Sequence, residues 1–97
     1  MDFEWDSSKA EDNLKRHKVS FLEAIETFSD PNGLTLRDEK HSKSEERFYW
    51  IGKSSLGRVL TTRYTRRDNK IRVIGSSEWR EFKEVYYGKT KHKESKI

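Results

Sequence analysis

The first residues of the chain predict one short strand followed by a helix. Phe3 and Trp5 flank a glutamate, and this alternation of apolar and polar positions is typical of a β-strand. Asp6 or Ser8 can then cap a helix, because a short side-chain oxygen accepts a hydrogen bond from the free amides of a first helical turn. We expect this helix to end at about residue 17.

A second helix is predicted from a stronger pattern. Ser20 and Glu23 form a capping box three residues apart, and Pro31 cannot continue a helix, so it marks the end of the segment. One apolar face recurs between these limits, at Phe21, Leu22, Ile25 and Phe28. We expect Phe21, Ile25 and Phe28 to be largely buried.

From residue 34 the spacing of the apolar residues changes from the helical period to alternation, in which every second residue is apolar. Four strands are predicted, over residues 34–37, 47–53, 58–65 and 70–75. The connections over 54–57 and 66–69 are short, and a parallel pair of strands would need a crossover of about a dozen residues or more. The strands that these short links join are therefore predicted to be antiparallel neighbours.

The last helix is predicted to begin after Ser76 or Ser77 and to end at Gly88. Its apolar face consists of Trp79, Phe82, Val85 and Tyr86, of which we expect Phe82 to be largely buried. The resulting order β-α-α-β-β-β-β-α predicts an α+β fold, an antiparallel sheet with helices packed on one face and the other face in water. We expect residues 1–88 to form the single domain and residues 89–97 to form a basic, disordered tail.

Composition narrows the class of protein. The chain has 97 residues, 39% of them charged, with a net charge of +4 and twelve aromatic residues. These values fit one small domain with a thin, aromatic core. No apolar stretch is long enough for a membrane span or a signal peptide, and the absence of cysteine excludes disulfides and thiolate metal sites. We therefore expect a cytoplasmic protein without membrane contact.

Basic residues are concentrated in the last two predicted strands. Residues 58–72 carry five arginines and one lysine against the single acid Asp68. Such a cluster is typical of a surface that binds the phosphate backbone of a nucleic acid. The alternative is that these side chains only solvate the exposed face of the sheet.

Other chemistry finds no support in the motifs. His17, His41 and His92 lack the spacing of metal ligands, and the carboxylates lie beside lysines and arginines, so we predict neither a metal site nor a cofactor. Gly52-Lys53-Ser54 lacks the preceding glycine of a phosphate-binding loop and is predicted to be a turn.

Metal-free RNA cleavage fits the remaining residues. The substrate's own 2′-hydroxyl attacks the adjacent phosphate, so the enzyme needs only an acid, a base and cations. The candidate proton-transfer groups are His17, Glu46 and Tyr64, and the candidate cations at the scissile phosphate are Arg58 and Arg67. Further RNA contacts are assigned to Arg16, Arg47, Arg63, Lys70 and Arg72. Each proton-transfer group also has a structural explanation: packing at a helix end for His17, pairing with Arg47 for Glu46, and filling of a strand position for Tyr64.

The order of these residues resembles the BrnT family of toxins. In the first part of the chain the resemblance rests on Phe3-Glu4-Trp5-Asp6, Lys9, Asn13, Arg16-His17, Val19-Ser20-Phe21, Glu23-Ala24, Phe28 and Asp30-Pro31. It continues through Glu45-Glu46-Arg47, Gly52-x-Ser54, Gly57-Arg58, Tyr64-Thr65, Arg67 and Ile71-Arg72-Val73-Ile74. Two positions depart from the family: Lys18 stands where it usually has glycine, and Ser77 where it usually has arginine.

The resemblance implies a fold similar to the RelE ribonucleases and a role in a bacterial type II toxin–antitoxin module. Such a toxin cleaves RNA and arrests translation and growth. It is neutralised by a BrnA-type antitoxin of the ribbon-helix-helix class, and it reaches operator DNA only through that complex. Two alternatives remain open at this point: a non-catalytic nucleic-acid-binding or corepressor domain, and a protein-interaction module whose basic face meets an acidic chain.

Overall fold

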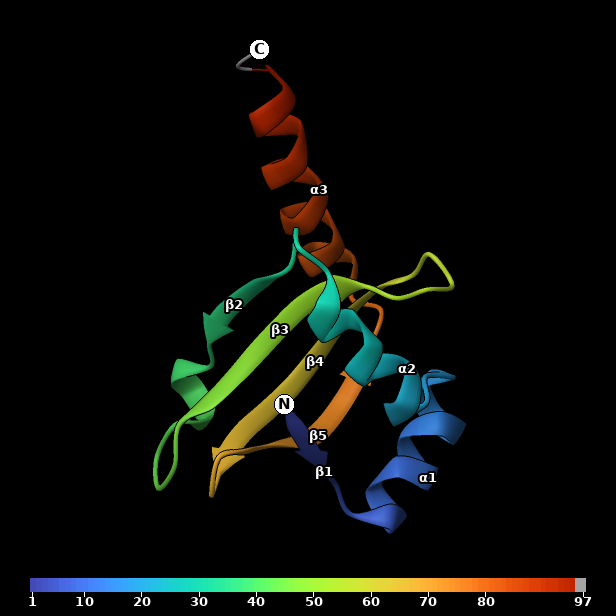
Figure 1. The fold of residues 1–97 in the computed structure, drawn as a ribbon, viewed down its shortest axis with the longest axis vertical. Helices are drawn as coiled ribbons and strands as arrows, with labels where there is room; N and C mark the ends of the chain where they lie inside the picture. Colours follow the sequence, from blue (N-terminus) through green and yellow to red (C-terminus); the bar gives the residue numbers. More distant parts are fainter. Residues whose placement is uncertain (96–97) are drawn as a thin grey trace.

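The protein is built around one five-stranded sheet in the order β1-β5-β4-β3-β2 (Figure 1). The computed structural model describes the backbone of residues 1–95 and the side chains of residues 1–88. The strands are β1 (Asp2–Glu4), β2 (Leu34–Arg37), β3 (Arg47–Lys53), β4 (Val59–Arg67) and β5 (Lys70–Ser77). The α+β class and the four antiparallel strands β2 to β5 are confirmed.

The sheet is mixed rather than purely antiparallel, because β1 pairs in parallel with β5. Phe3 lies opposite Ile71, so the first strand and the last strand of the chain are neighbours. No short turn joins these two strands, and hence no local signal fixed their relative direction. The expectation of an all-antiparallel sheet was wrong at this edge.

Two helices and a 3-10 turn connect β1 to β2, and a third helix follows β5. These elements are α1 (Ser7–His17), α2 (Phe21–Glu26), the 3-10 helix η1 (Thr27–Ser29) and α3 (Arg80–Ser95); a short 3-10 helix, η2 (Glu39–His41), lies between β2 and β3. Asp6 caps α1 by accepting from the amides of Ser8 and Lys9, and Ser20 caps α2 by accepting from the amide of Glu23 at 3.0 Å. Both caps follow the expected chemistry of a helix start.

The helices pack on both faces of the sheet, which corrects the expected one-sided arrangement. On one face, Phe28 of η1 stacks on Trp50 and meets the edge of the Tyr64 ring. On the other face, α3 packs through Phe82 against Tyr49. Tyr49 and Trp50 are consecutive, so their side chains point to opposite faces. The two faces therefore have separate apolar clusters.

The ends and faces of the helices differ from the sequence pattern in three respects. Phe21 is buried as expected, but Ile25, Phe28 and Phe82 are only half-buried, and Leu22 is 66% exposed. Ser76 and Ser77 belong to β5 and do not cap the last helix. α3 continues through Gly88 to Ser95 and extends away from the end of the sheet (Figure 1). The predicted tail, residues 89–97, is thus helical to residue 95, and its side chains and last two residues lie outside the described part of the chain.

Candidate nucleic-acid interface

Four arginines share the face of the sheet that α3 covers only in part. Arg47, Thr65 and Arg72 stand side by side on β3, β4 and β5. Arg63 and Arg67 lie two residues to either side of Thr65, and strand residues two apart share a face. We call the surface formed by Arg47, Arg63, Arg67 and Arg72 the basic face.

The basic face begins where the cover of α3 ends. Trp79 and Phe82 pack on the Tyr49 ring, with centroid distances of 5.9 and 5.0 Å. Burial raises the pKa of Tyr49, and a hydrogen bond to Asp38 raises it further. Tyr49 stands directly opposite Arg63, so the last aromatic residue under α3 borders the first cation of the basic face.

Two carboxylates lie among the arginines of the basic face. Arg67 binds Glu45 at 3.0 Å, Arg47 approaches the same carboxylate at 3.9 Å, and Arg72 binds Glu4 at 3.4 Å. The Arg67 hydrogen bond holds the pKa of Glu45 below its usual value. Sequence reasoning missed Glu45 and Glu4, because they lie 22 and 68 residues from their partners.

A cavity of about 240 Å³ lies between α1 and this face of the sheet. It is lined by Lys9, Asp12, Asn13, Arg16, His17, Arg63 and Ile74, and we call it the α1 hollow. Three of these side chains are cationic and one is acidic, apart from the histidine. The α1 hollow therefore brings together three of the predicted site residues, Arg16, His17 and Arg63.

Gly75 allows Arg63 to reach the α1 hollow. The two residues stand opposite each other on β4 and β5, and a Cβ atom at position 75 would lie only 3.0 Å from the Arg63 Nη2 atom. With no side chain at Gly75, the guanidinium can lie across β5 towards α1. A larger residue at that position would push the arginine out.

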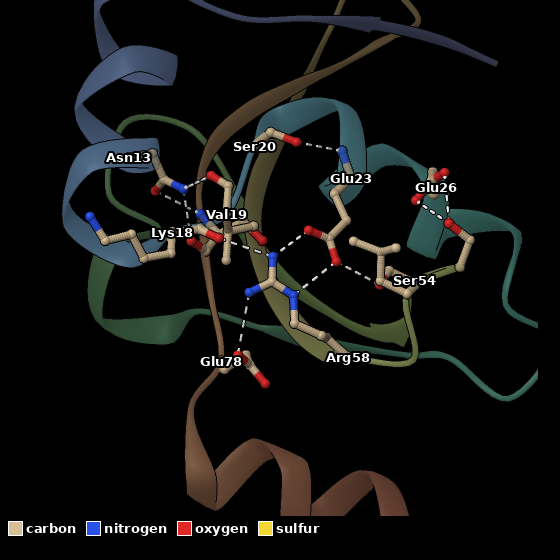
Figure 2. Close-up of polar contacts among 12 residues, drawn as sticks. Asn13, Lys18, Val19, Ser20, Glu23, Glu26, Ser54, Arg58 and Glu78 are labelled. Atoms are coloured by element: carbon tan, nitrogen blue, oxygen red, sulfur yellow. Dashed lines mark hydrogen bonds and ion pairs between the residues drawn. The ribbon is translucent and has the colours of Figure 1, made fainter.

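Asn13 attaches α1 to β5. Its amide nitrogen donates to the carbonyl oxygens of Val19 and Ser76, both at 2.9 Å, and its amide oxygen accepts from the Ser76 nitrogen at 3.1 Å (Figure 2). All three bonds are buried, and a satisfied buried network of this kind fixes geometry. An asparagine is a poor residue for the middle of a helix, and that signal could have identified it.

Arg58 lies apart from the basic face, in a network of ion pairs at the turn of the β3–β4 hairpin, directly before β4 (Figure 2). It binds both carboxylate oxygens of Glu23, which is only 8% exposed, and its Nη1 atom lies 3.5 Å from Glu78. The Arg58 hydrogen bond lowers the pKa of Glu23 although burial opposes ionisation, and the same bond raises the pKa of Arg58.

Glu46 and Tyr64 do not come together with His17. Glu46 pairs with Arg37 of β2 at 3.2 Å on the exposed edge of the sheet. Tyr64 is 4% exposed and packs against Phe48 and Phe28 on the face opposite the basic face. Lys70 is exposed at the start of β5, where it stands opposite Arg67 of β4. Of the three predicted proton-transfer groups, His17 is therefore the one that lines the α1 hollow.

Nowhere in residues 1–88 do three histidine, aspartate or glutamate side chains gather as metal ligands would. None of the described helices combines the length and the apolar character needed to cross a membrane.

Comparison with known proteins identifies a family for this chain. No curated protein matches the chain. The sequence model of one family, described as the ribonuclease toxin BrnT of type II toxin–antitoxin systems, matches residues 5–81. That span includes α1, α2 and the whole of β2 to β5, and so both the basic face and the α1 hollow. The chain therefore belongs to the BrnT family of ribonuclease toxins, the toxins of type II toxin–antitoxin systems.

Proposed function

We propose that this chain is an endoribonuclease that binds RNA across the basic face and cleaves it at the α1 hollow without a metal ion. The observation that carries the proposal is the meeting of Arg16, His17 and Arg63 around one cavity. Arginine forks bind phosphate oxygens in a bidentate way, and imidazole is the side chain best suited to proton transfer near neutral pH.

In the proposed reaction, the 2′-hydroxyl oxygen of the RNA bonds to the adjacent phosphorus while its proton passes to the His17 imidazole. The bond from phosphorus to the 5′-oxygen breaks, and that oxygen takes a proton from solvent. Arg16 and Arg63 stabilise the negative charge that develops on the phosphate oxygens. The products are a 2′,3′-cyclic phosphate and a free 5′-hydroxyl end.

The remaining arginines would hold the flanking nucleotides. Arg47, Arg67, Arg72 and Lys70 form a track beside the α1 hollow, and binding there replaces the contacts with Glu45 and Glu4. Arg58, Glu46 and Tyr64 are left out of the proposed chemistry because of their positions. In the cell, cleavage would act in the cytoplasm and arrest translation.

A cleavage assay on the purified full-length chain tests this proposal. Replacing His17 with Gln should reduce cleavage by roughly 10²–10⁴-fold while RNA binding persists, the usual contribution of a positioned acid–base group. The matched control is His41→Gln, since His41 is the last residue of η2, is bound to Asp38, and should not affect the rate. Chelator should leave the wild-type rate unchanged. Equal loss in both histidine variants would contradict the proposed site.

The implied antitoxin would be a BrnA-type ribbon-helix-helix protein that covers the basic face, and operator DNA would be bound only by the complex. Burying several cations requires acidic or aromatic anchors on the partner. Growth of cells that express the toxin with and without the neighbouring gene provides the test. Toxicity that the neighbouring gene does not relieve would contradict the antitoxin assignment.

A second candidate function is a non-catalytic nucleic-acid-binding or corepressor domain. It is favoured by Ser77, which stands at the family's usual arginine position and is buried opposite Thr61. Wild-type protein that binds RNA but never cleaves it would select this function, and Ser77→Arg would then be the variant to examine.

A further inference from the structure

We propose that Arg58 is a positioning residue that fixes the C-terminal turn of α1, and through it His17, and that it does not bind phosphate. The inference deepens the proposed function and rests on it for its kinetic consequences. Its structural part concerns the turn alone and can be measured without activity.

The turn between α1 and α2 is held at two consecutive carbonyl groups. α1 ends at His17, and Lys18 then adopts the left-handed conformation, with φ 59° and ψ 32°. The Lys18 carbonyl accepts from Arg58 Nη2 at 3.0 Å, and the Val19 carbonyl accepts from Asn13 Nδ2 at 2.9 Å (Figure 2). The two peptide units that follow Lys18, directly after the end of α1, are therefore anchored to the β3–β4 hairpin and to α1 itself.

The acceptors around Arg58 leave its guanidinium little freedom to turn towards RNA. Nε and Nη2 bind the two oxygens of Glu23, Nη2 also binds the Lys18 carbonyl, and Nη1 faces Glu78. The carboxylate is fixed in turn, because Ser54 Oγ donates to Glu23 Oε2 at 2.7 Å. These contacts draw on all three guanidinium nitrogens, and a planar fork cannot reorient without losing several of them at once.

The charge balance also separates Arg58 from the basic face. One cation here faces two carboxylates, Glu23 and Glu78, so the group has no excess positive charge to attract a phosphate. In the α1 hollow the balance is reversed, with three cationic side chains against Asp12. Arg58 is suited to holding protein segments together, whereas Arg63 is suited to an anion.

Loss of Arg58 would release the turn and leave the Glu23 carboxylate buried without its main partner. His17 would then lose its fixed distance to Arg63, and a misplacement of about 1 Å can reduce a rate by about 10²-fold. Because Arg58 does not contact RNA, binding should not change. This combination, a lower kcat with unchanged affinity, differs from the loss of a phosphate ligand.

The test compares Arg58→Met and Arg58→Lys with Arg37→Met in the full-length chain. Arg37 is a matched control, since it also pairs with two carboxylates, Glu39 and Glu46, but lies on β2 far from α1. We expect both Arg58 variants to lower kcat by about 10–10²-fold. The salt dependence of RNA binding should be unchanged. A salt slope reduced by about one, with kcat preserved, would show that Arg58 is a phosphate ligand and overturn the proposal.

Hydrogen exchange of the amides of residues 17–19 gives the readout that needs no activity. Exchange should accelerate in Arg58→Met and stay unchanged in Arg37→Met, under conditions in which both variants are folded by circular dichroism. If Arg58→Met does not fold, Arg58→Lys carries the comparison. Unchanged exchange in a folded Arg58 variant would refute the positioning role, whereas wild-type protein without cleavage activity would refute only the proposed function.

Discussion

Replacing Lys18 with glycine should stabilise the protein. Lys18 follows the last residue of α1 with φ at 59°, in the left-handed region. For a residue with a Cβ atom that conformation costs roughly 1–2 kcal/mol, whereas glycine adopts it freely. Glycine is also the residue most often found in the left-handed conformation directly after the end of a helix.

The expected gain is smaller than the strain that is relieved. Glycine also loses more conformational entropy on folding, which offsets about 0.5–1 kcal/mol. The Lys18 side chain is exposed, and the two bonds at this residue come from its backbone: the amide donates to the Leu14 carbonyl and the carbonyl accepts from Arg58. A net gain of about 0.5–1 kcal/mol remains, which corresponds to about 3–6 °C in Tm for a domain of this size.

Thermal and urea unfolding followed by circular dichroism measure this gain. The matched control is Lys15→Gly, which places the same residue one turn earlier, at an exposed position inside α1. Glycine inside a helix destabilises by about 0.5–1 kcal/mol, so the two variants should shift Tm in opposite directions. If Lys18→Gly lowers Tm by as much as Lys15→Gly, the left-handed conformation of Lys18 is refuted.

Three further predictions concern the site and its supports. Glu23→Gln should lower the free energy of unfolding by about 3 kcal/mol at neutral pH, because it leaves Arg58 without its main partner. Arg58 lowers the pKa of Glu23, so the stabilisation is present above about pH 4.3, the ordinary glutamate value, and is lost as the pH falls further. Denaturant titrations should therefore show that the free energy of unfolding depends less on pH in the acid range for the variant than for the wild type. Glu45→Gln should tighten RNA binding in a fluorescence titration, since Arg67 and Arg47 lose an internal competitor for phosphate, and weaker binding would contradict that competition. Gly75→Ser should leave Tm nearly unchanged but reduce cleavage, because its Cβ displaces the Arg63 guanidinium; full activity would show that Arg63 need not lie across β5.

The parts of the fold that depend on neighbouring residues were predictable from the sequence. Ser20 caps α2, and the β4–β5 connection is a tight turn in which Asp68 and Asn69 both have positive φ. These features need only a side chain and the adjacent backbone. The turn is shorter than the predicted 66–69, since Arg66 and Arg67 still belong to β4.

The layer arrangement was not predicted, although β3 carries a signal for it. Residues 48–51 are Phe, Tyr, Trp and Ile, a continuous apolar run rather than an alternation. Such a run is typical of a strand that is buried on both faces. Trp50 accordingly packs under η1, while Ile51 belongs to the cluster under α3. The parallel pairing of β1 with β5 has no comparable local signal, because these strands are the first and the last in the chain.

The site was predicted in composition but not in arrangement. The sequence identifies the arginines, yet whether an arginine can bind phosphate depends on carboxylates from distant segments. Arg58 meets Glu23 across 35 residues, and Arg72 meets Glu4 across 68. The distribution of Tyr64 and His17 between opposite faces likewise depends on strand register and on where α1 packs, which Asn13 determines through β5.

The carboxylates that pair with each arginine, rather than the number of arginines, determine where a phosphate would bind most favourably. Arg58 and Arg37 each face two carboxylates, while Arg67 and Arg72 each bind one. In the described part of the chain no carboxylate forms an ion pair with Arg63, which lines the α1 hollow beside His17. A phosphate bound to Arg63 displaces no ion-pair partner of that arginine, and only the exposed pair of Arg16 with Asp12, at 3.3 Å, competes in the same cavity. Electrostatics therefore favours the Arg63 position over the rest of the basic face. His17, the candidate proton-transfer group, lines the same cavity as Arg63. For this reason we expect cleavage of bound RNA to take place at the α1 hollow.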